Sequence, residues 1–154
     1  MQIRLAESAD IVAIGALVEA AYAPYLPRLE RAPAPVLADY QALVDAGEAW
    51  IGISNGHMVG VLVIRAGDDA LELENVAVDP AFQGRGYGRA LITFAEERAR
   101  ELGLPSVTLY TNEVMVENLH LYPRLGFVET GRRVENGYRR VFFRKSLDAR
   151  VRRS

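Results

Sequence analysis

A glycine-rich turn between a predicted strand and a predicted helix is the feature that most constrains the fold of this chain. Residues 78–89 read VDPAFQGRGYGR. Residues 71–78 form a β-type run, and apolar residues recur at helical spacing over 88–102. The first backbone N–H groups of a helix lack internal partners and carry about half a positive charge. The turn therefore predicts a cradle for a phosphate group.

Glycines and arginines of the turn suit that ligand. Gly84, Gly86 and Gly88 lack the Cβ atoms that would hold a phosphate away, and glycine accepts backbone angles that other residues resist. Arg85 and Arg89 add charged donors. The spacing fits neither the dinucleotide pattern GxGxxG, with an acid about 20 residues further on, nor the P-loop pattern GxxxxGK[ST]. A pyrophosphate turn of another kind is therefore expected.

A second segment of the sequence narrows the interpretation of this turn. The turn has the pattern Gln/Arg-x-x-Gly-x-Gly at Gln83, Gly86 and Gly88, and residues 121–127 read LYPRLGF. In this order and spacing the two segments resemble the GNAT superfamily of coenzyme A-dependent N-acyltransferases. The resemblance covers roughly residues 1–147 and implies one N-acetyltransferase domain there, with residues 148–154 as a basic tail. It also implies acetyl-CoA as acyl donor and no metal.

The resemblance further implies roles for single residues. Tyr122 is expected to give a proton to the departing thioester sulfur. The backbone of Val76 and Val78 is expected to bind the pantetheine arm, and an N–H near Val76 to polarise the thioester carbonyl. The expected cofactor-binding residues are Val76, Ala77, Val78, Gln83, Gly84, Arg85, Gly86, Tyr87, Gly88, Arg89 and Asn118.

The base that accepts the proton of the amine is predicted on the strand before the turn. Glu74 is the leading candidate because it lies two residues before Val76. Glu72 points the same way if the strand is regular, whereas a β-bulge would reverse that facing. Glu113, Glu117 and a chain of water molecules are the alternatives.

One position departs from the family pattern. Members often carry an asparagine seven residues before the tyrosine, where this chain has Met115. Asn118 lies one helical turn before Tyr122 on the same face. It either replaces the missing asparagine at the cofactor or caps and solvates its own helix.

The remaining sequence predicts an α+β fold, with a mixed, mostly antiparallel central sheet of about seven strands flanked by about four helices. Glu96 and Arg100 are expected to pair on the outer face of one helix. Hairpin turns are expected at 55–56 and 136–137, both Asn-Gly. Strands are expected at 2–6, 49–54, 58–66, 71–78, 107–111, 127–134 and 138–145. Helices are expected after a cap at Ser8 or Asp10, over 36–46 and 88–102, and around Tyr122.

Composition narrows the chemistry and the location. The chain has 154 residues, a net charge of −2 and no cysteine. The absence of cysteine excludes disulfides, thiolate metal sites and a cysteine acyl carrier. The net charge gives no general attraction to nucleic acid. His57 and His120 are not expected to form a metal site. No stretch is expected to span a membrane, so the predicted location is cytoplasmic.

The predicted function is transfer of an acetyl group from acetyl-CoA to a primary amine, directly within a ternary complex. The short chain favours a small-molecule acceptor. Tyr22, Tyr25, Tyr40 and Trp50 either line the acceptor pocket or belong to the core. Three alternatives stay open: a coenzyme A-binding sensor without turnover, a protein N-terminal acetyltransferase, and a binder of another nucleotide phosphate. The oligomeric state is also open, a homodimer included.

Overall fold

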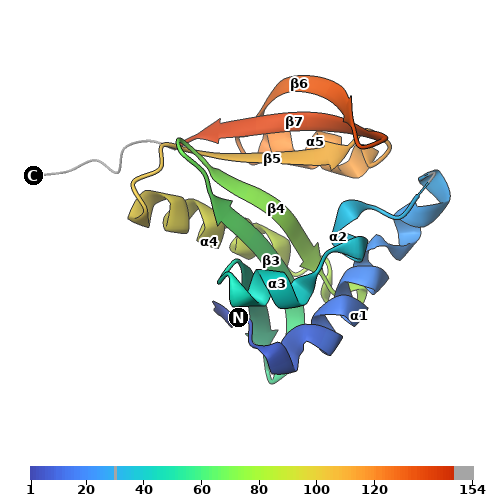
Figure 1. Ribbon diagram of the computed structural model, residues 1–154, viewed down its shortest axis with the longest axis vertical. Helices are drawn as coiled ribbons and strands as arrows, with labels where there is room; N and C mark the ends of the chain where they lie inside the picture. The colour runs from blue at the N-terminus through green and yellow to red at the C-terminus, as the bar shows by residue number, and fades with distance from the viewer. Residues whose placement is uncertain (30, 148–154) are drawn as a thin grey trace, which may run out of the picture. The chain divides into compact units, whose positions relative to one another are not determined.

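The computed structural model describes residues 1–29 and 31–147 of the chain (Figure 1). The chain divides into two compact units, the first formed by Met1–Arg65 with Glu74–Phe94, the second by Ala66–Leu73 with the described residues from Ala95 onward. The predicted basic tail at 148–154 lies outside the described residues. The elements are β1 (Gln2–Leu5), η1 (Ser8–Asp10), α1 (Ile11–Tyr22), η2 (Ala23–Arg28), α2 (Ala34–Leu37), α3 (Tyr40–Asp45), β2 (Ala49–Ser54), β3 (His57–Ala66), β4 (Leu71–Val78), η3 (Pro80–Phe82), α4 (Tyr87–Glu101), β5 (Ser106–Asn112), α5 (Val116–Arg124), β6 (Val128–Glu135) and β7 (Tyr138–Ser146).

The strands form a seven-stranded sheet in the order β1-β2-β3-β4-β5-β7-β6. The neighbours β1 and β2, β2 and β3, β5 and β7, and β6 and β7 are antiparallel. β4 and β5 are parallel, from Leu71 opposite Val107 to Leu73 opposite Leu109. Helix α4 supplies the crossover that parallel neighbours require. The predicted mixed, mostly antiparallel α+β fold is confirmed.

Helices pack on both faces of the sheet in the first unit. Ile51 belongs to a core cluster with Leu17 and Val18 of α1 and with Tyr40 of α3. Trp50, its neighbour in β2, stacks instead on Phe94 of α4, with ring centroids 4.9 Å apart. Because successive strand residues point to opposite faces, α1 and α3 cover one face and the first half of α4 covers the other.

In the second unit, α5 packs against the β7 strand through aromatic rings. The Tyr122 ring centroid lies 5.7 Å from that of Phe127 and 5.8 Å from that of Phe143. Lys145 Nζ lies 3.0 Å from Glu96 Oε2 of α4. Glu96 therefore does not pair with Arg100 as predicted, and Arg100 pairs with Glu97 at 3.3 Å.

The predicted helix over 36–46 is wrong in one respect, because two short helices, α2 and α3, occupy this region. Ala38 between them has an extended backbone with ψ 149°. Asp39 then caps α3, since its side chain accepts a hydrogen bond from the Ala42 N–H at 3.1 Å. An aspartate that starts a new helix interrupts the one before it, so the described part of the chain has five α-helices where about four are expected.

The predicted cap of α1 is also only partly right. Asp10 occupies the N-cap position, but its side chain makes no capping hydrogen bond to α1. The carboxylate accepts instead from the Glu7 N–H at 2.8 Å and from Arg4 at 2.9 Å. It therefore stabilises the turn between β1 and α1, and Ser8 is the first residue of the 3-10 helix η1 in that turn.

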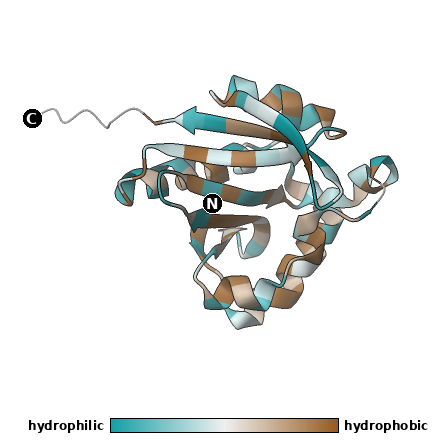
Figure 2. Cartoon of the chain, turned by 45° about the horizontal axis from the view of Figure 1, so that its top comes forward, coloured by the Kyte–Doolittle hydropathy of each residue, from teal (hydrophilic) through white to brown (hydrophobic). Residues whose placement is uncertain are grey.

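Among the residues that the structure describes, one run has the length and composition of a membrane span. Ser8–Arg28 has 21 residues and a mean hydropathy of 1.3 over its most apolar window, of which 17% is buried. This run differs from the expectation that no stretch could span a membrane, and Figure 2 shows how apolar α1 is. Within the run, Ile14, Leu17 and Val18 are buried in the core. Core helices pass the same test, so the run is weak evidence for a membrane span, and the cytoplasmic location stays a prediction.

Candidate active site

The turn predicted to be a phosphate cradle lies in the first unit, where β4 leads through η3 into α4. Gly84 has φ 81° and Gly86 has φ 85°, angles that favour glycine. A Cβ atom at either position would have no neighbour within 4 Å. The Gly86 carbonyl accepts the first hydrogen bond of α4, from the Ala90 N–H at 3.0 Å. The backbone at this helix start is therefore accessible to a ligand, as an anion site requires.

Side chains of the turn fix its shape. Asp79 Oδ1 accepts from the Ala81 N–H at 2.9 Å, and the Asp79 N–H donates to the Val59 carbonyl at 2.9 Å. Gln83 Nε2 donates to the Val78 carbonyl at 3.2 Å. The glutamine of the sequence motif thus holds the turn closed on the strand end, which leaves the following glycine backbone in a fixed position.

Gly88 differs from the other two glycines. Its φ is not positive, and a Cβ atom there would lie 3.6 Å from Val78 Cγ2, which is ordinary contact. Its conformation therefore does not require glycine. Arg85 and Arg89 are exposed, and the Arg85 guanidinium lies 5.3 Å from the centroid of the Phe82 ring.

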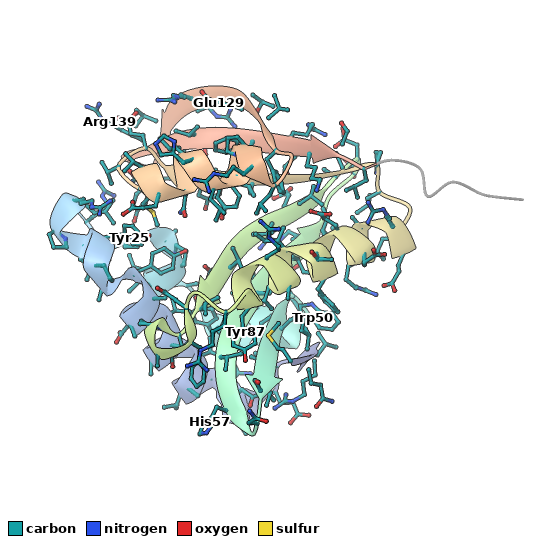
Figure 3. All side chains as sticks on the ribbon, turned by 180° about the vertical axis from the view of Figure 1, so that it is seen from behind. Tyr25, Trp50, His57, Tyr87, Glu129 and Arg139 are labelled. Atoms are coloured by element: carbon teal, nitrogen blue, oxygen red, sulfur yellow. The ribbon has the colours of Figure 1, made fainter. Side chains whose placement is uncertain are left out.

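Residues of the β2–β3 hairpin support the start of α4, a contact that was not predicted from the sequence. The Tyr87 hydroxyl lies 3.0 Å from Ser54 Oγ, and its ring is 6.5 Å from that of Phe82. His57 lies 6.0 Å from the same Phe82 ring and is exposed at the hairpin turn (Figure 3). Ser54 and His57 lie too far in sequence from Tyr87 and Phe82 for a local pattern to predict these contacts, so they are recognised only in the folded structure.

Side-chain exposure alternates along β4 without interruption. Val76 and Val78 are half-buried, whereas Ala77 is 5% exposed and belongs to the core cluster with Tyr40. Glu74 is one of the more exposed residues that alternate with the buried ones along β4. Its Oε2 lies 2.8 Å from Arg65 Nη1. The predicted base is therefore held in an ion pair.

A buried amide precedes Val76 on this strand. Asn75 is 4% exposed, and its Oδ1 accepts from the Tyr22 hydroxyl at 2.8 Å. Its Nδ2 donates to the Tyr40 hydroxyl at 3.4 Å, and that hydroxyl donates to the Pro35 carbonyl at 2.6 Å. Burial raises the pKa of Tyr40 to about 12, against a smaller lowering by the bond from Asn75. Tyr40 is therefore neutral at physiological pH. We call these four residues the Asn75 network.

The Asn75 network was missed from the sequence. Tyr22 and Tyr40 were considered as pocket or core residues, together with Tyr25 and Trp50. The structure brings Tyr22 close to Tyr25, with ring centroids 6.5 Å apart, and joins Tyr22 to Tyr40 through Asn75, whereas Trp50 packs on α4. A signal existed, because Asn75 occupies an inward position between apolar residues of the strand.

In the second unit, the predicted acid Tyr122 is 6% exposed in helix α5. Its ring is fixed by Phe127 and Phe143, as described above. Pro123 follows it within the helix, and the Tyr122 carbonyl accepts hydrogen bonds from the N–H groups of Leu125 and Phe127, both at 3.0 Å. Tyr122 thus has a rigid ring and backbone.

Asn118 uses its amide within the same unit. Asn118 Nδ2 donates to Thr111 Oγ1 at 3.1 Å, and that hydroxyl lies 3.8 Å from the sulfur of Met115. Met115 is 5% exposed and occupies the N-cap position of α5. Asn118 therefore ties α5 to β5, and its contact with a cofactor stays a prediction.

Glu113, His57 and His120 are further ionisable residues named from the sequence. Glu113 forms an ion pair with Arg139 at 3.4 Å, and both belong to the second unit. His57 and His120 are both exposed. Over the described ranges 1–29 and 31–147, no group of three or more histidine, cysteine, aspartate or glutamate side chains is placed to hold a metal ion.

Comparison with known proteins gives the family. A model of the acetyltransferase (GNAT) family matches residues 14–127. The chain therefore belongs to the GNAT family of acetyltransferases, as the two sequence segments predicted.

Relatives by sequence are acetyltransferases. The uncharacterized N-acetyltransferase YvbK of Bacillus subtilis strain 168 is 28% identical over 85 residues, which are 54% of this chain and 55% of that protein. The mycothiol acetyltransferase of Thermomonospora curvata is 34% identical over 84 residues, which are 54% of this chain and 28% of that protein. The chain thus spans about half the length of the first relative and less than a third of the second.

Solved structures share the fold. The putative acetyltransferase YncA of Salmonella typhimurium, solved with acetyl-CoA, has a TM-score of 0.72 at 23% identity, covering 98% of this chain and 96% of that one. The ribosomal-protein-S18-alanine N-acetyltransferase of Escherichia coli has a TM-score of 0.75 at 20% identity, covering 99% and 97%. These similarities confirm the predicted GNAT-like fold.

Proposed function

We propose that this chain transfers an acetyl group from acetyl-CoA to a primary amine, by direct transfer within a ternary complex. The observation that carries the proposal is the cradle at the start of α4, where Gly84 and Gly86 have positive φ and open space at the position of a Cβ atom. The pyrophosphate of coenzyme A fits such a site, because it is a dianion that accepts several backbone hydrogen bonds. Membership of the GNAT family supports this ligand over other phosphates.

The proposed chemistry assigns one task to each of three groups. When bound, acetyl-CoA supplies a thioester carbonyl that the amine attacks. The Val76 N–H stabilises negative charge on the carbonyl oxygen. Tyr122 donates its phenolic proton to the leaving sulfur, and Glu74 accepts the proton of the amine directly or through a water molecule. The remaining cofactor-binding residues named above, Asn118 included, are part of the same proposal.

A small-molecule amine is the proposed acceptor. The name of the relative from Thermomonospora, mycothiol acetyltransferase, points to acetyl transfer to a small molecule, whereas the name of the fold neighbour from Escherichia points to the alanine of a ribosomal protein. A panel of amines separates the two kinds of acceptor. It contains L-amino acids, a polyamine, an aminoglycoside and a peptide with N-terminal alanine.

The first experiment is calorimetric titration of the protein with acetyl-CoA, coenzyme A and ATP in parallel. We expect both coenzyme A species to bind and ATP to bind at least about tenfold more weakly. Gly86→Val is expected to abolish this binding, because a branched side chain strains a positive φ and fills the cradle. Preferential binding of ATP would contradict the proposal.

Gly47→Val is the matched control for that variant. Gly47 has φ 72° and no neighbour within 4 Å of its Cβ position, as Gly86 does, but it lies after α3 and outside the cradle. Both variants should lose similar stability, and only Gly86→Val should lose coenzyme A binding. Binding without turnover of any amine in the panel would instead support the sensor alternative.

A further inference from the structure

The Asn75 network has only one consistent arrangement of hydrogen atoms. The Tyr40 hydroxyl has a single proton, and the 2.6 Å contact directs it to the Pro35 carbonyl, which can only accept. Tyr40 must then accept from the amide of Asn75, so Nδ2 faces Tyr40 and Oδ1 faces Tyr22. Tyr22 must donate in turn. Each group depends on its neighbour, so the network holds its members in one geometry.

These hydrogen bonds connect a proline-rich segment to β4. Tyr22 is the last residue of α1, Tyr40 is the first residue of α3, and Pro35 lies in α2 between them. Both ends of the segment 23–39 are therefore attached to the side chain of Asn75, through Tyr22 and Tyr40. Pro35, inside the segment, is attached through the Tyr40 hydroxyl. Asn75 immediately precedes Val76, whose N–H is the proposed partner of the thioester carbonyl.

Packing alone does not require an amide at this position. The other inward residues of β4, which are Leu71, Leu73 and Ala77, are apolar and at most 5% exposed. A leucine has the same branched arrangement of heavy atoms as an asparagine and costs no desolvation, whereas a buried amide is costly unless its hydrogen bonds are made. The amide therefore contributes directional hydrogen bonds that fix Tyr22 and Tyr40, which apolar packing does not provide.

We infer that Asn75 is a positioning residue for the amine acceptor, which it serves by fixing the described residues of this segment, 23–29 and 31–39, relative to the acyl-binding backbone of β4. The inference rests on the proposed function. Tyr22 and Tyr25, at the start of this segment, are half-buried and offer aromatic surface to an acceptor. Loss of the network should loosen this surface while the cradle of 83–89 is preserved, because no member of the network belongs to the cradle.

Hydrogen exchange of the whole protein tests the inference without any acceptor. Tyr40→Phe removes one oxygen atom and leaves the Pro35 carbonyl and the Asn75 amide without this partner. We expect exchange of backbone amides within 23–39 to rise at least about tenfold, while exchange in α4 changes little. Tyr22→Phe, which removes a less buried hydroxyl of the same network, should have the same effect.

Ser106→Ala is the matched control. Ser106 is 3% exposed, donates to the Asp69 carbonyl at 3.2 Å and accepts from Arg144 at 2.6 Å, all within the second unit. The Ser106→Ala variant therefore removes a buried hydroxyl that also has two hydrogen-bond partners, but in the second unit. If Tyr40→Phe accelerates exchange in 23–39 no more than Ser106→Ala does, the network does not hold this segment and the inference is wrong.

Steady-state kinetics test the role in acceptor binding. With the amine of the panel that the wild-type protein acetylates fastest, Tyr40→Phe should raise the KM for the amine about tenfold and change the KM for acetyl-CoA less than about twofold. Equal changes in both constants would overturn the inference, because they indicate a general structural defect.

Titration with coenzyme A separates this inference from the proposed function. Tyr40→Phe should bind coenzyme A with the affinity of the wild-type protein. A wild-type protein that binds no coenzyme A would overturn the proposed function and, with it, the role toward an acceptor. Faster exchange in 23–39 would then still identify the network as the attachment of that segment.

Discussion

At the scale of single residues, the hydroxyl of Tyr122 is the group on which the proposed chemistry depends most. Tyr122→Phe keeps the ring that packs on Phe127 and Phe143 and removes only the oxygen atom. A positioned acid typically contributes a factor of 10²–10⁴ to the rate. We expect kcat to fall about a hundredfold and the affinity for coenzyme A to change little, as measured by steady-state kinetics and calorimetry.

Tyr110→Phe provides the comparison for that variant. Tyr110 also belongs to the second unit, where its ring lies under the Arg140 guanidinium at 4.1 Å. It has no proposed role, so its variant should keep the wild-type kcat. A Tyr122→Phe protein with an unchanged kcat would show that another group, or solvent, protonates the sulfur.

The predictable residues of the site are those whose role follows from local sequence. The glycine-rich turn predicts backbone angles at Gly84 and Gly86 that other residues resist, and both have positive φ. Asn75 was not identified, because its partners Tyr22 and Tyr40 lie more than thirty positions away in the chain. A buried polar residue is recognised as part of a network only when its partners are known.

At the scale of elements, the turn from β1 to α1 contains an ion pair that makes stability depend on pH. The Arg4 guanidinium, which donates to the carboxylate, holds the pKa of Asp10 below its ordinary value of 3.8. A carboxyl group whose pKa is lower in the folded state stabilises the fold above its unfolded pKa, and this contribution disappears as the pH falls through the folded pKa. The stabilising window therefore lies above about pH 4.

Asp10→Asn tests this dependence. We expect the variant to have a Tm a few degrees lower than that of the wild-type protein at neutral pH, since partly exposed pairs contribute little. The difference should shrink as the pH falls from about 4 to about 2. Thermal unfolding followed by circular dichroism over this range, with Asp68→Asn in the β3–β4 turn as reference, measures it. A difference independent of pH would assign the effect to packing.

Elements with strong local signals were predicted nearly to the residue. Both Asn-Gly hairpins form as predicted, and Asn55 and Asn136 have φ of 51° and 53°. The sequence predicts one continuous helix over 36–46, whereas Asp39 caps a separate helix, α3, within this range. A cap in the middle of an apolar pattern is ambiguous, since the same residue also occurs on the outer face of a helix.

At the scale of the whole molecule, the order of the strands followed from connection rules. The helix over 88–102 predicted that β4 and β5 are parallel, and their register confirms it. Partners distant in sequence could not be predicted in this way. Glu96 was expected to pair with Arg100 one turn away but pairs with Lys145, because the packing of β7 near α4 depends on the tertiary structure.

The two compact units are expected to unfold together, because continuous elements run through both. β4 changes unit between Leu73 and Glu74, and α4 changes unit between Phe94 and Ala95. If only one unit unfolded, β4 and α4 would each lose the hydrogen bonds at the point where they pass from one unit to the other. The single tryptophan, Trp50, reports on the first unit through its contact with Phe94.

Urea unfolding followed by two probes tests this cooperativity. Trp50 fluorescence follows the first unit, and hydrogen exchange of β5 and β7 amides follows the second. We expect one midpoint for both probes, within about 0.2 M urea, and a single m-value that matches a chain of this length. A second-unit transition at lower urea would mean that the hydrogen bonds of β4 and α4 do not couple the units. Tyr122 and the Asn75 network would then respond to destabilising mutations independently, and the variants proposed above would need separate stability controls for each unit.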